Sequence, residues 1–214
     1  MVKDPIIIKV IEVGDFSTNC YIVGNSQNSA FIIDPGDELE KIERVIKKYK
    51  FKPQFIINTH AHIDHIKEDE NFELPVYIHY KDIPLLKDPQ LNLSSFLSLP
   101  FSFKKEYLIR EVRDGEFISF DSQKIEVIHT PGHTPGSICL RLGNYLFSGD
   151  TLFCNSVGRT DFPSADSGLL LSSIKEKLFS IDEDLVVLPG HGSFTSLEKE
   201  KRGNIFLREG EKLY

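Results

Sequence analysis

The chain has 214 residues, of which 40% are hydrophobic and 27% charged, as in an ordinary globular protein. Its 25 Lys and Arg against 32 Asp and Glu give a formal net charge of −7, so no basic stripe is available for a phosphate backbone, and nucleic acid is not expected as the main partner. No run approaches the roughly 18 consecutive apolar residues of a membrane helix, so no membrane association is expected.

The first part of the chain predicts strands joined by turns, followed by a helix. Runs rich in Ile and Val are separated by Gly, Asn and Ser, which favours hairpins. These runs cover residues 6–13, 19–23 and 30–33. Apolar residues at helical spacing then predict an amphipathic helix over Leu39–Tyr49.

Shorter elements are expected up to residue 104. They comprise a strand at 55–58, a strand at Val76–His79 and a helical turn at 81–87. Residues 89–104 interleave Leu and Phe with Ser and Pro without a clean period, which predicts a long loop or a mobile cover.

The second half repeats this style, with apolar strand-like runs before and after one helical segment. Strands are expected at 125–129, 137–142, 145–148 and 185–188, and a helix at 168–179. No short repeat or low-complexity linker interrupts the chain, so residues 1–214 are expected to form one domain. Strands and helices in two similar halves predict an α/β fold of two packed sheets with helices outside.

The strongest chemical signal is the hexapeptide of residues 60–65, directly after an apolar strand. Three of the seven histidines fall in it, namely His60, His62 and His65, together with Asp64. In an extended segment residues two apart point the same way, so His60 and His62 can converge on one cation. Imidazole and carboxylate donors suit a borderline metal such as zinc.

Three further loops each contribute one potential ligand immediately after an apolar strand. His133 lies in a Pro- and Gly-rich loop, Asp150 ends the run Phe-Ser-Gly-Asp, and His191 follows Pro189-Gly190. Taken singly, an Asp or His in such a turn is usually turn chemistry. Their shared placement predicts that all three lie beside the hexapeptide in a metal-dependent hydrolase.

The cysteines and the remaining histidines are not expected in this site. Cys20, Cys139 and Cys154 are odd in number and widely spaced, which argues against a disulfide framework and favours the reducing cytoplasm. The start of the chain lacks the pattern of a signal peptide. His79 and His129 are interpreted as strand-end histidines, and Cys154 as a free thiol.

The motif set resembles the metallo-β-lactamase superfamily, whose signature is H-x-H-x-D-H followed by a His, an Asp and a His on later loops. The likeness runs from about residue 19 to residue 207. It implies a four-layer αβ/βα sandwich, with mixed sheets inside, helices outside and the metals at one edge of the sheets.

The resemblance also implies a role for each residue of the set. His60, His62 and His133 would bind one metal, Asp64, His65 and His191 a second, and Asp150 would bridge the two. The cofactors would be two divalent transition-metal ions, Zn²⁺ foremost, with Fe or Mn as alternatives. Such a pair can hold a bridging hydroxide that attacks a carbonyl, and Asp64 would act catalytically by orienting the attacking water.

Within the superfamily, the chain is most similar to the short single-domain relatives of glyoxalase II, the hydroxyacylglutathione hydrolases. The likeness rests on the segments at 158–163 and 200–207. It implies hydrolysis of a small-molecule thioester, glutathione-linked in that family. A homo-oligomer is compatible with the sequence, and no substrate-binding residue is predicted.

Two features depart from that family. The chain ends soon after His191, so no separate C-terminal glutathione-binding domain is expected. Bulky residues, among them Ile66 and Lys67, follow His65 where the family usually has small ones. Their side chains could narrow the site or favour an anionic substrate through Lys67; the alternative, and the favoured interpretation of Lys67, is a solvated helix residue.

Other members of the superfamily supply the alternatives. A persulfide dioxygenase, with one iron at the positions of His60, His133 and Asp150, also carries the Gly-Arg-Thr-Asp-Phe run. Class B β-lactamases are secreted and usually place Cys at the position of Asp150, and nucleases of the fold are longer and carry RNA-binding arms. A non-catalytic metal-binding module is the remaining alternative.

Overall fold

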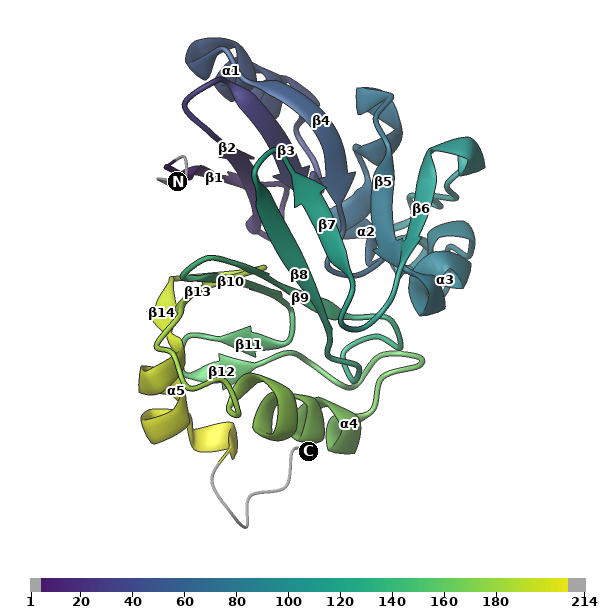
Figure 1. The fold of residues 1–214 in the computed structure, drawn as a ribbon. Helices are drawn as coiled ribbons and strands as arrows, with labels where there is room; N and C mark the ends of the chain where they lie inside the picture. The colour runs from purple at the N-terminus through teal and green to yellow at the C-terminus, as the bar shows by residue number, and fades with distance from the viewer. Residues whose placement is uncertain (1–4, 208–214) are drawn as a thin grey trace.

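The computed structural model describes residues 5–207 and places most of its strands in two six-stranded sheets that face each other (Figure 1). The first sheet has the order β1-β2-β3-β4-β5-β6. Its strands are Ile7–Val13, Thr18–Gly24, Ser29–Ile33, Lys52–Ile57, Val76–His79 and Ile109–Val112. β1 to β3 pair antiparallel through tight turns, whereas β3 to β6 pair in parallel and need crossover connections.

The second sheet has the order β14-β13-β10-β9-β8-β7. In chain order its strands are Phe117–Phe120 (β7), Gln123–His129 (β8), Ile138–Leu142 (β9), Tyr145–Gly149 (β10), Val186–Pro189 (β13) and Thr195–Ser196 (β14). β10 and β13 are parallel, and the other neighbours are antiparallel. A separate pair, β11 (Leu152–Phe153) and β12 (Ser156–Val157), follows β10.

Helices cover the outer faces of the sheets. The α-helices are α1 (Leu39–Tyr49), α2 (Ile63–Ile66), α3 (Ile83–Lys87), α4 (Ser167–Ser172) and α5 (Leu197–Gly203). The 3₁₀ turns are η1 (Asp69–Phe72), η2 (Tyr80–Asp82), η3 (Ser94–Leu97), η4 (Glu106–Leu108) and η6 (Ile205–Leu207). The segment η5 (Ser173–Leu178) continues α4 with π-helical geometry.

Alternation along the strands creates three apolar layers. On β3, Ile32 faces the helices of the first half and joins the cluster of Ile42 from α1, whereas Phe31 and Ile33 face the second sheet. On the far side, Leu146 of β10 packs in a third cluster with α4 and α5. Strands buried on both faces need apolar residues at successive positions, which explains their continuous Ile- and Val-rich runs. The expected four-layer αβ/βα arrangement is confirmed.

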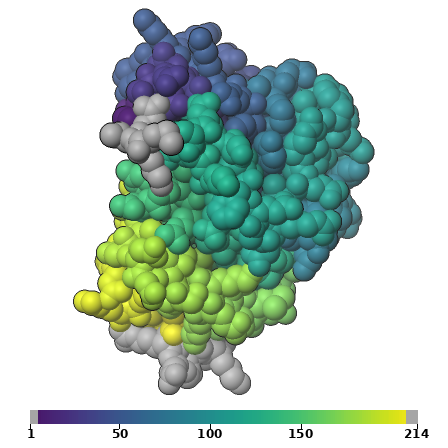
Figure 2. Space-filling view, viewed as in Figure 1, coloured from purple at the N-terminus to yellow at the C-terminus, as the bar shows by residue number. Residues whose placement is uncertain are grey.

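The space-filling view shows where the early and the late parts of the chain lie in the molecule. The first half, purple to teal, fills the upper and right-hand part, and the last quarter, green to yellow, fills the lower part (Figure 2). Within residues 5–207, no helix is both long and apolar enough to cross a membrane.

Several expected elements differ from those observed. β4 begins at Lys52, before the apolar run that predicts it, and β6, β7 and the short strands β11, β12 and β14 have no counterpart among the expected strands. The predicted helix at 168–179 changes to π-helical geometry at Ser173. Segment 89–104 contains η3, and its residues Leu91, Phe101 and Phe103 pack against the first core cluster, so it is more than a loop.

Candidate metal centre

Strand ends place the predicted site residues at one edge of the two facing sheets. β4 leads into His60, β8 into the loop of His133, β10 into Asp150 and β13 into His191. The structure brings these segments together, because donor groups from all four of them fall in three overlapping clusters.

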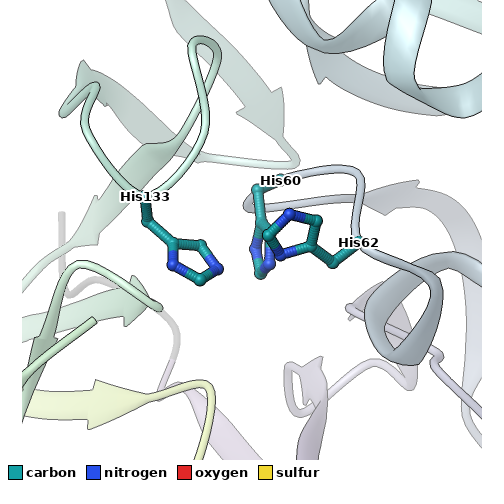
Figure 3. Close-up of side chains that lie close together, drawn as sticks. All are labelled: His60, His62 and His133. Atoms are coloured by element: carbon teal, nitrogen blue, oxygen red, sulfur yellow. The ribbon is translucent and has the colours of Figure 1, made fainter. Parts of the chain in front are cut away.

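His60, His62 and His133 form the first cluster. Their ring centroids lie 4.6–4.8 Å apart, and the rings converge from two separate loops (Figure 3). The Nε2 atoms of all three are buried without a hydrogen-bond partner in the described structure. A buried polar atom without a partner is costly, and three such lone pairs facing one point fit a metal ion.

Asp64, His65 and His191 form a second cluster next to the first. The Nε2 atoms of His65 and His191 are 3.3 Å apart, and Asp64 Oδ2 lies 3.5 Å from the former and 3.3 Å from the latter. Asp64 Oδ2 also accepts a 3.0 Å hydrogen bond from the hydroxyl of Thr18. This mixed nitrogen and oxygen set fits a second divalent ion.

Asp150 lies between the two clusters. Its Oδ1 is 3.5 Å from His65 Nε2, and its Oδ2 is 3.5 Å from the Nε2 atoms of both His133 and His191. One carboxylate therefore reaches histidines of both clusters, which is compatible with the bridging role that the resemblance implies.

In His133, His191 and His65, the ring nitrogen that faces away from the centre contacts an oxygen atom. His133 Nδ1 donates to the carbonyl of Arg159 at 2.7 Å, and His191 Nδ1 donates to that of Phe16 at 3.0 Å. His65 Nδ1 lies 3.0 Å from the Asp34 carboxylate. A proton held on Nδ1 leaves Nε2 as the lone-pair donor toward the centre.

The charges around the clusters favour bound cations. Burial lowers the pKa of His60, His62 and His133, so these imidazoles are held in the neutral form that ligates metals. His65 is also buried, but the carboxylates of Asp64, Asp34 and Asp150 outweigh burial and raise its pKa to about 10. The same negative field stabilises a metal cation at this position. Burial opposes ionisation of Asp64, yet the histidines around it hold its pKa below the usual range.

Asp82 is a site residue that the sequence analysis missed. Buried completely, it accepts hydrogen bonds from the Ala61 amide at 3.0 Å, the Thr134 hydroxyl at 2.7 Å and the Gly136 amide at 2.6 Å. It thus joins the loop of His60 and His62 to the loop that carries His133. Burial raises the pKa of this carboxyl to about 6, despite these donors.

Asp34 also holds a ligand-bearing segment in place, and the sequence did not indicate it. Its carboxylate accepts hydrogen bonds from the Thr59 amide at 2.8 Å and the Thr59 hydroxyl at 2.7 Å, and it also contacts His65. In sequence, the Asp-Pro-Gly at 34–36 indicates only a turn. The placement of Asp34 directly after a strand, shared with the predicted ligands, was the available signal.

Glycine is required where backbone passes close to the donors. A Cβ atom on Gly190 would lie 2.2 Å from Asp150 Oδ1 and 2.9 Å from His65 Cε1. One on Gly158 would lie 1.8 Å from the carbonyl oxygen of Asp150. These contacts explain why the ligand loops contain glycine.

A cleft of about 660 Å³ opens beside the clusters. Its lining combines five of the predicted site residues with apolar side chains from several loops. The five are His62, Asp64, His133, Asp150 and His191, and the apolar residues are Phe16, Ile63, Leu93, Phe96, Leu97, Phe153, Phe162 and Pro163. Part of segment 89–104 therefore borders the site. The arrangement can hold two cations next to a largely apolar substrate-sized space.

The residues set aside in the sequence lie outside the three donor clusters. His79 stacks on His129 with ring centroids 3.9 Å apart, and Cys154 accepts a weak contact from Lys199. Lys67 pairs with Asp37 at 2.7 Å and is absent from the lining of the cleft, which agrees with its interpretation as a solvated residue.

Comparison with known proteins gives matches over most of the chain. A model of the metallo-beta-lactamase superfamily matches residues 13–191. The hydroxyacylglutathione hydrolase GloC of Haemophilus influenzae is 32% identical, and the match covers 94% of this chain and 97% of GloC.

Two solved structures extend the likeness. The BLEG-1 B3 metallo-beta-lactamase is 37% identical, with a TM-score of 0.87 over 94% of this chain and 99% of that one. TTHA1623 in a di-iron-bound form is 35% identical, with a TM-score of 0.80 over 93% of this chain and 100% of that one. The family model covers most of the chain, and these relatives are 32–37% identical to it over nearly its whole length. The chain therefore belongs to the metallo-beta-lactamase superfamily.

Proposed function

We propose that this metallo-hydrolase cleaves thioesters of the hydroxyacylglutathione type. The observation that carries the proposal is the pair of donor clusters with Asp150 between them, beside a cleft that their residues line. Full-length similarity to GloC supports the thioester as the substrate class. A cytoplasmic enzyme of small-molecule metabolism is the setting that this proposal assumes.

The two donor clusters would hold the metals. His60, His62 and His133 would bind one ion, Asp64, His65 and His191 the other, and Asp150 both. Zinc suits this set of imidazoles and carboxylates, and the di-iron-bound TTHA1623 makes iron the second candidate. Bound there, two divalent ions would polarise a carbonyl and lower the pKa of a water molecule.

The chain's own residues would position the reactants. Asp64 faces the cleft and is held by Thr18, so its carboxylate can accept a hydrogen bond from a water and orient it toward a substrate carbonyl. Phe153 and Phe162 line the same cleft and would displace bulk water from the reacting groups. Hydrolysis then breaks the C–S bond, and the departing sulfur leaves as a thiol.

β-Lactam hydrolysis is a second candidate, because the BLEG-1 B3 metallo-beta-lactamase matches nearly the whole chain. Both reactions add water to a carbonyl, so the ligand set alone does not separate them. The group that departs from the carbonyl is a thiol in one case and the ring nitrogen of the lactam in the other.

Metal analysis combined with three assays tests the proposal. We expect about two transition-metal ions per chain in protein purified without chelator, and turnover of S-lactoylglutathione. Faster hydrolysis of a chromogenic cephalosporin would favour the second candidate. One iron per chain with oxygen uptake on glutathione persulfide would contradict both hydrolase assignments.

A further inference from the structure

One side of the cleft is an apolar wall made of Leu93, Phe96 and Leu97, the latter two on the turn η3. Phe96 is 72% exposed and Leu97 is 39% exposed. Large apolar side chains that line a cleft and remain this exposed have surface left for a ligand to bury.

The apolar wall is held in a fixed position relative to the donor clusters. The amide of Ile63, between His62 and Asp64, donates a 2.9 Å hydrogen bond to the carbonyl of Asn92. The buried Asn92 side chain closes the segment by donating to the Phe101 carbonyl and accepting from the Ser94 amide, each at 3.0 Å. The wall is therefore tied to the segment of residues 60–65, which carries four predicted ligands.

Few positively charged side chains line the cleft, so little is available there to bind a negatively charged acyl group. Apart from histidines, Arg159 is the cationic side chain among the lining residues that the structure describes. Asp161 binds its guanidinium through two hydrogen bonds of 3.0 and 2.7 Å, and the same group stacks 4.4 Å from the centre of the Phe162 ring. Arg159 is thus paired on the side of the cleft formed by Phe162.

We infer that the apolar wall selects thioesters with a bulky apolar group, aryl or branched alkyl, on the carbon next to the scissile carbonyl. This inference rests on the proposed thioester hydrolysis. The segment of the wall is hydrogen-bonded to the ligand loop, and Phe96 and Leu97 line the same cleft as the donor residues. A substrate whose carbonyl lies at the metal centre would therefore place its α-substituent near Phe96 and Leu97. The thiol portion extends away from the wall, toward the side of the cleft formed by Phe162.

Two substrates that differ at one group test the inference. S-lactoylglutathione and S-mandeloylglutathione share the hydroxyl and the thiol, but carry a methyl or a phenyl group on the α-carbon. The quantity to measure is the ratio of kcat/KM for the mandeloyl to that for the lactoyl substrate. Comparing this ratio between variants cancels the intrinsic difference in reactivity.

Phe96→Ala and Leu97→Ala are expected to lower this ratio by about tenfold each, chiefly through KM for the mandeloyl substrate. Phe96→Leu, which keeps an apolar side chain, should restore most of it. Phe117→Ala is the matched control, since Phe117 is 57% exposed on β7 and lies outside the cleft.

The outcomes separate the two proposals. If the wild type hydrolyses both thioesters and the ratio stays within twofold in both alanine variants, the wall selects nothing and the inference is wrong, while thioester hydrolysis stands. If neither thioester is hydrolysed by the metal-loaded wild type, the proposed function is wrong and the inference falls with it.

Discussion

The hydroxyl of Thr134 donates a 2.7 Å hydrogen bond to the carboxylate of Asp82, which is 52 residues earlier in the chain. The same carboxylate accepts the Ala61 amide, so one buried side chain connects the two loops that supply His60, His62 and His133. The spacing between those loops sets the geometry of the first donor cluster. Asp82 is therefore a positioning residue that acts on the metal centre through its neighbours.

Asp82→Asn is expected to weaken metal binding by about 10- to 100-fold with little change in side-chain volume. All three partners of Asp82 donate hydrogen bonds, and an amide has one acceptor oxygen, so its NH₂ group would face a donor. The measurement is a competition titration against a chromophoric chelator, which reports affinity independently of catalysis.

Asp182→Asn is the matched control, because Asp182 is exposed and precedes β13 at the end remote from His191. It should bind metal like the wild type. Unchanged affinity in the Asp82 variant would mean that the ligand loops hold their spacing without the carboxylate.

The contrast between Asp82 and His60 shows what the sequence could predict. His60, His62, Asp64 and His65 lie within six residues, so their short separation along the chain is enough to predict that they lie close together, although Asp64 and His65 are on α2 rather than on an extended segment. Asp82 has no such local signature, because its partners at Ala61, Thr134 and Gly136 are close to it only in the folded chain.

The helices and strands show the same contrast between local signals and contacts that form only in the folded chain. α1 was predicted over Leu39–Tyr49, as observed, because its apolar spacing is strong and local. β6 (Ile109–Val112) contains Arg110 and Glu111 and was missed, since its pairing with β5 rather than its own composition makes it a strand. The wall in segment 89–104 was missed for a related reason, because the contact between Asn92 and Ile63 fixes its position.

Asp150→Ala is expected to lose both metals and to reduce the rate by more than the 10- to 100-fold typical of outer-shell changes. Its two oxygens reach His65, His133 and His191, so the substitution removes a potential ligand from beside both clusters. It also removes one of the negative charges that favour bound cations. Metal content by elemental analysis and the thioester rate check this. Cys154→Ser, four residues further on, is the control and should keep both metals; retention of metal by the Asp150 variant would remove Asp150 from the centre.

Gly190→Ala is expected to disturb metal binding without adding any polar group. The new methyl would meet Asp150 Oδ1 at 2.2 Å, so the carboxylate or the backbone has to move. Gly203→Ala is the matched control, since no atom lies within 4 Å of its Cβ position and alanine favours helix at the end of α5. We expect metal affinity, measured by chelator competition, to fall in the Gly190 variant alone. Equal affinities in the two variants would show that the Asp150 loop can move to accommodate the methyl group without disturbing the metal ligands.

The stacked pair His79 and His129 is expected to make stability depend on pH. Their rings lie 3.9 Å apart at 12°, and burial together with the neighbouring His129 and Lys81 lowers the pKa of His79 to about 3. The unfolded chain binds this proton near pH 6.5, whereas the folded chain stays neutral until about pH 3. Between these values the unfolded state holds more protons, so acidification destabilises the fold and stability rises with pH.

His79→Asn, which keeps a planar polar group and does not titrate, is expected to flatten this dependence. The urea midpoints of wild type and variant, measured without metal at about pH 7 and about pH 5, give the comparison. The wild type should lose more stability on acidification than the variant, by less than the limit of about 1.4 kcal/mol per pH unit that one proton sets, because solvent screens part of the effect. Equal losses in both proteins would mean that His79 takes up its proton in the folded state as readily as in the unfolded chain.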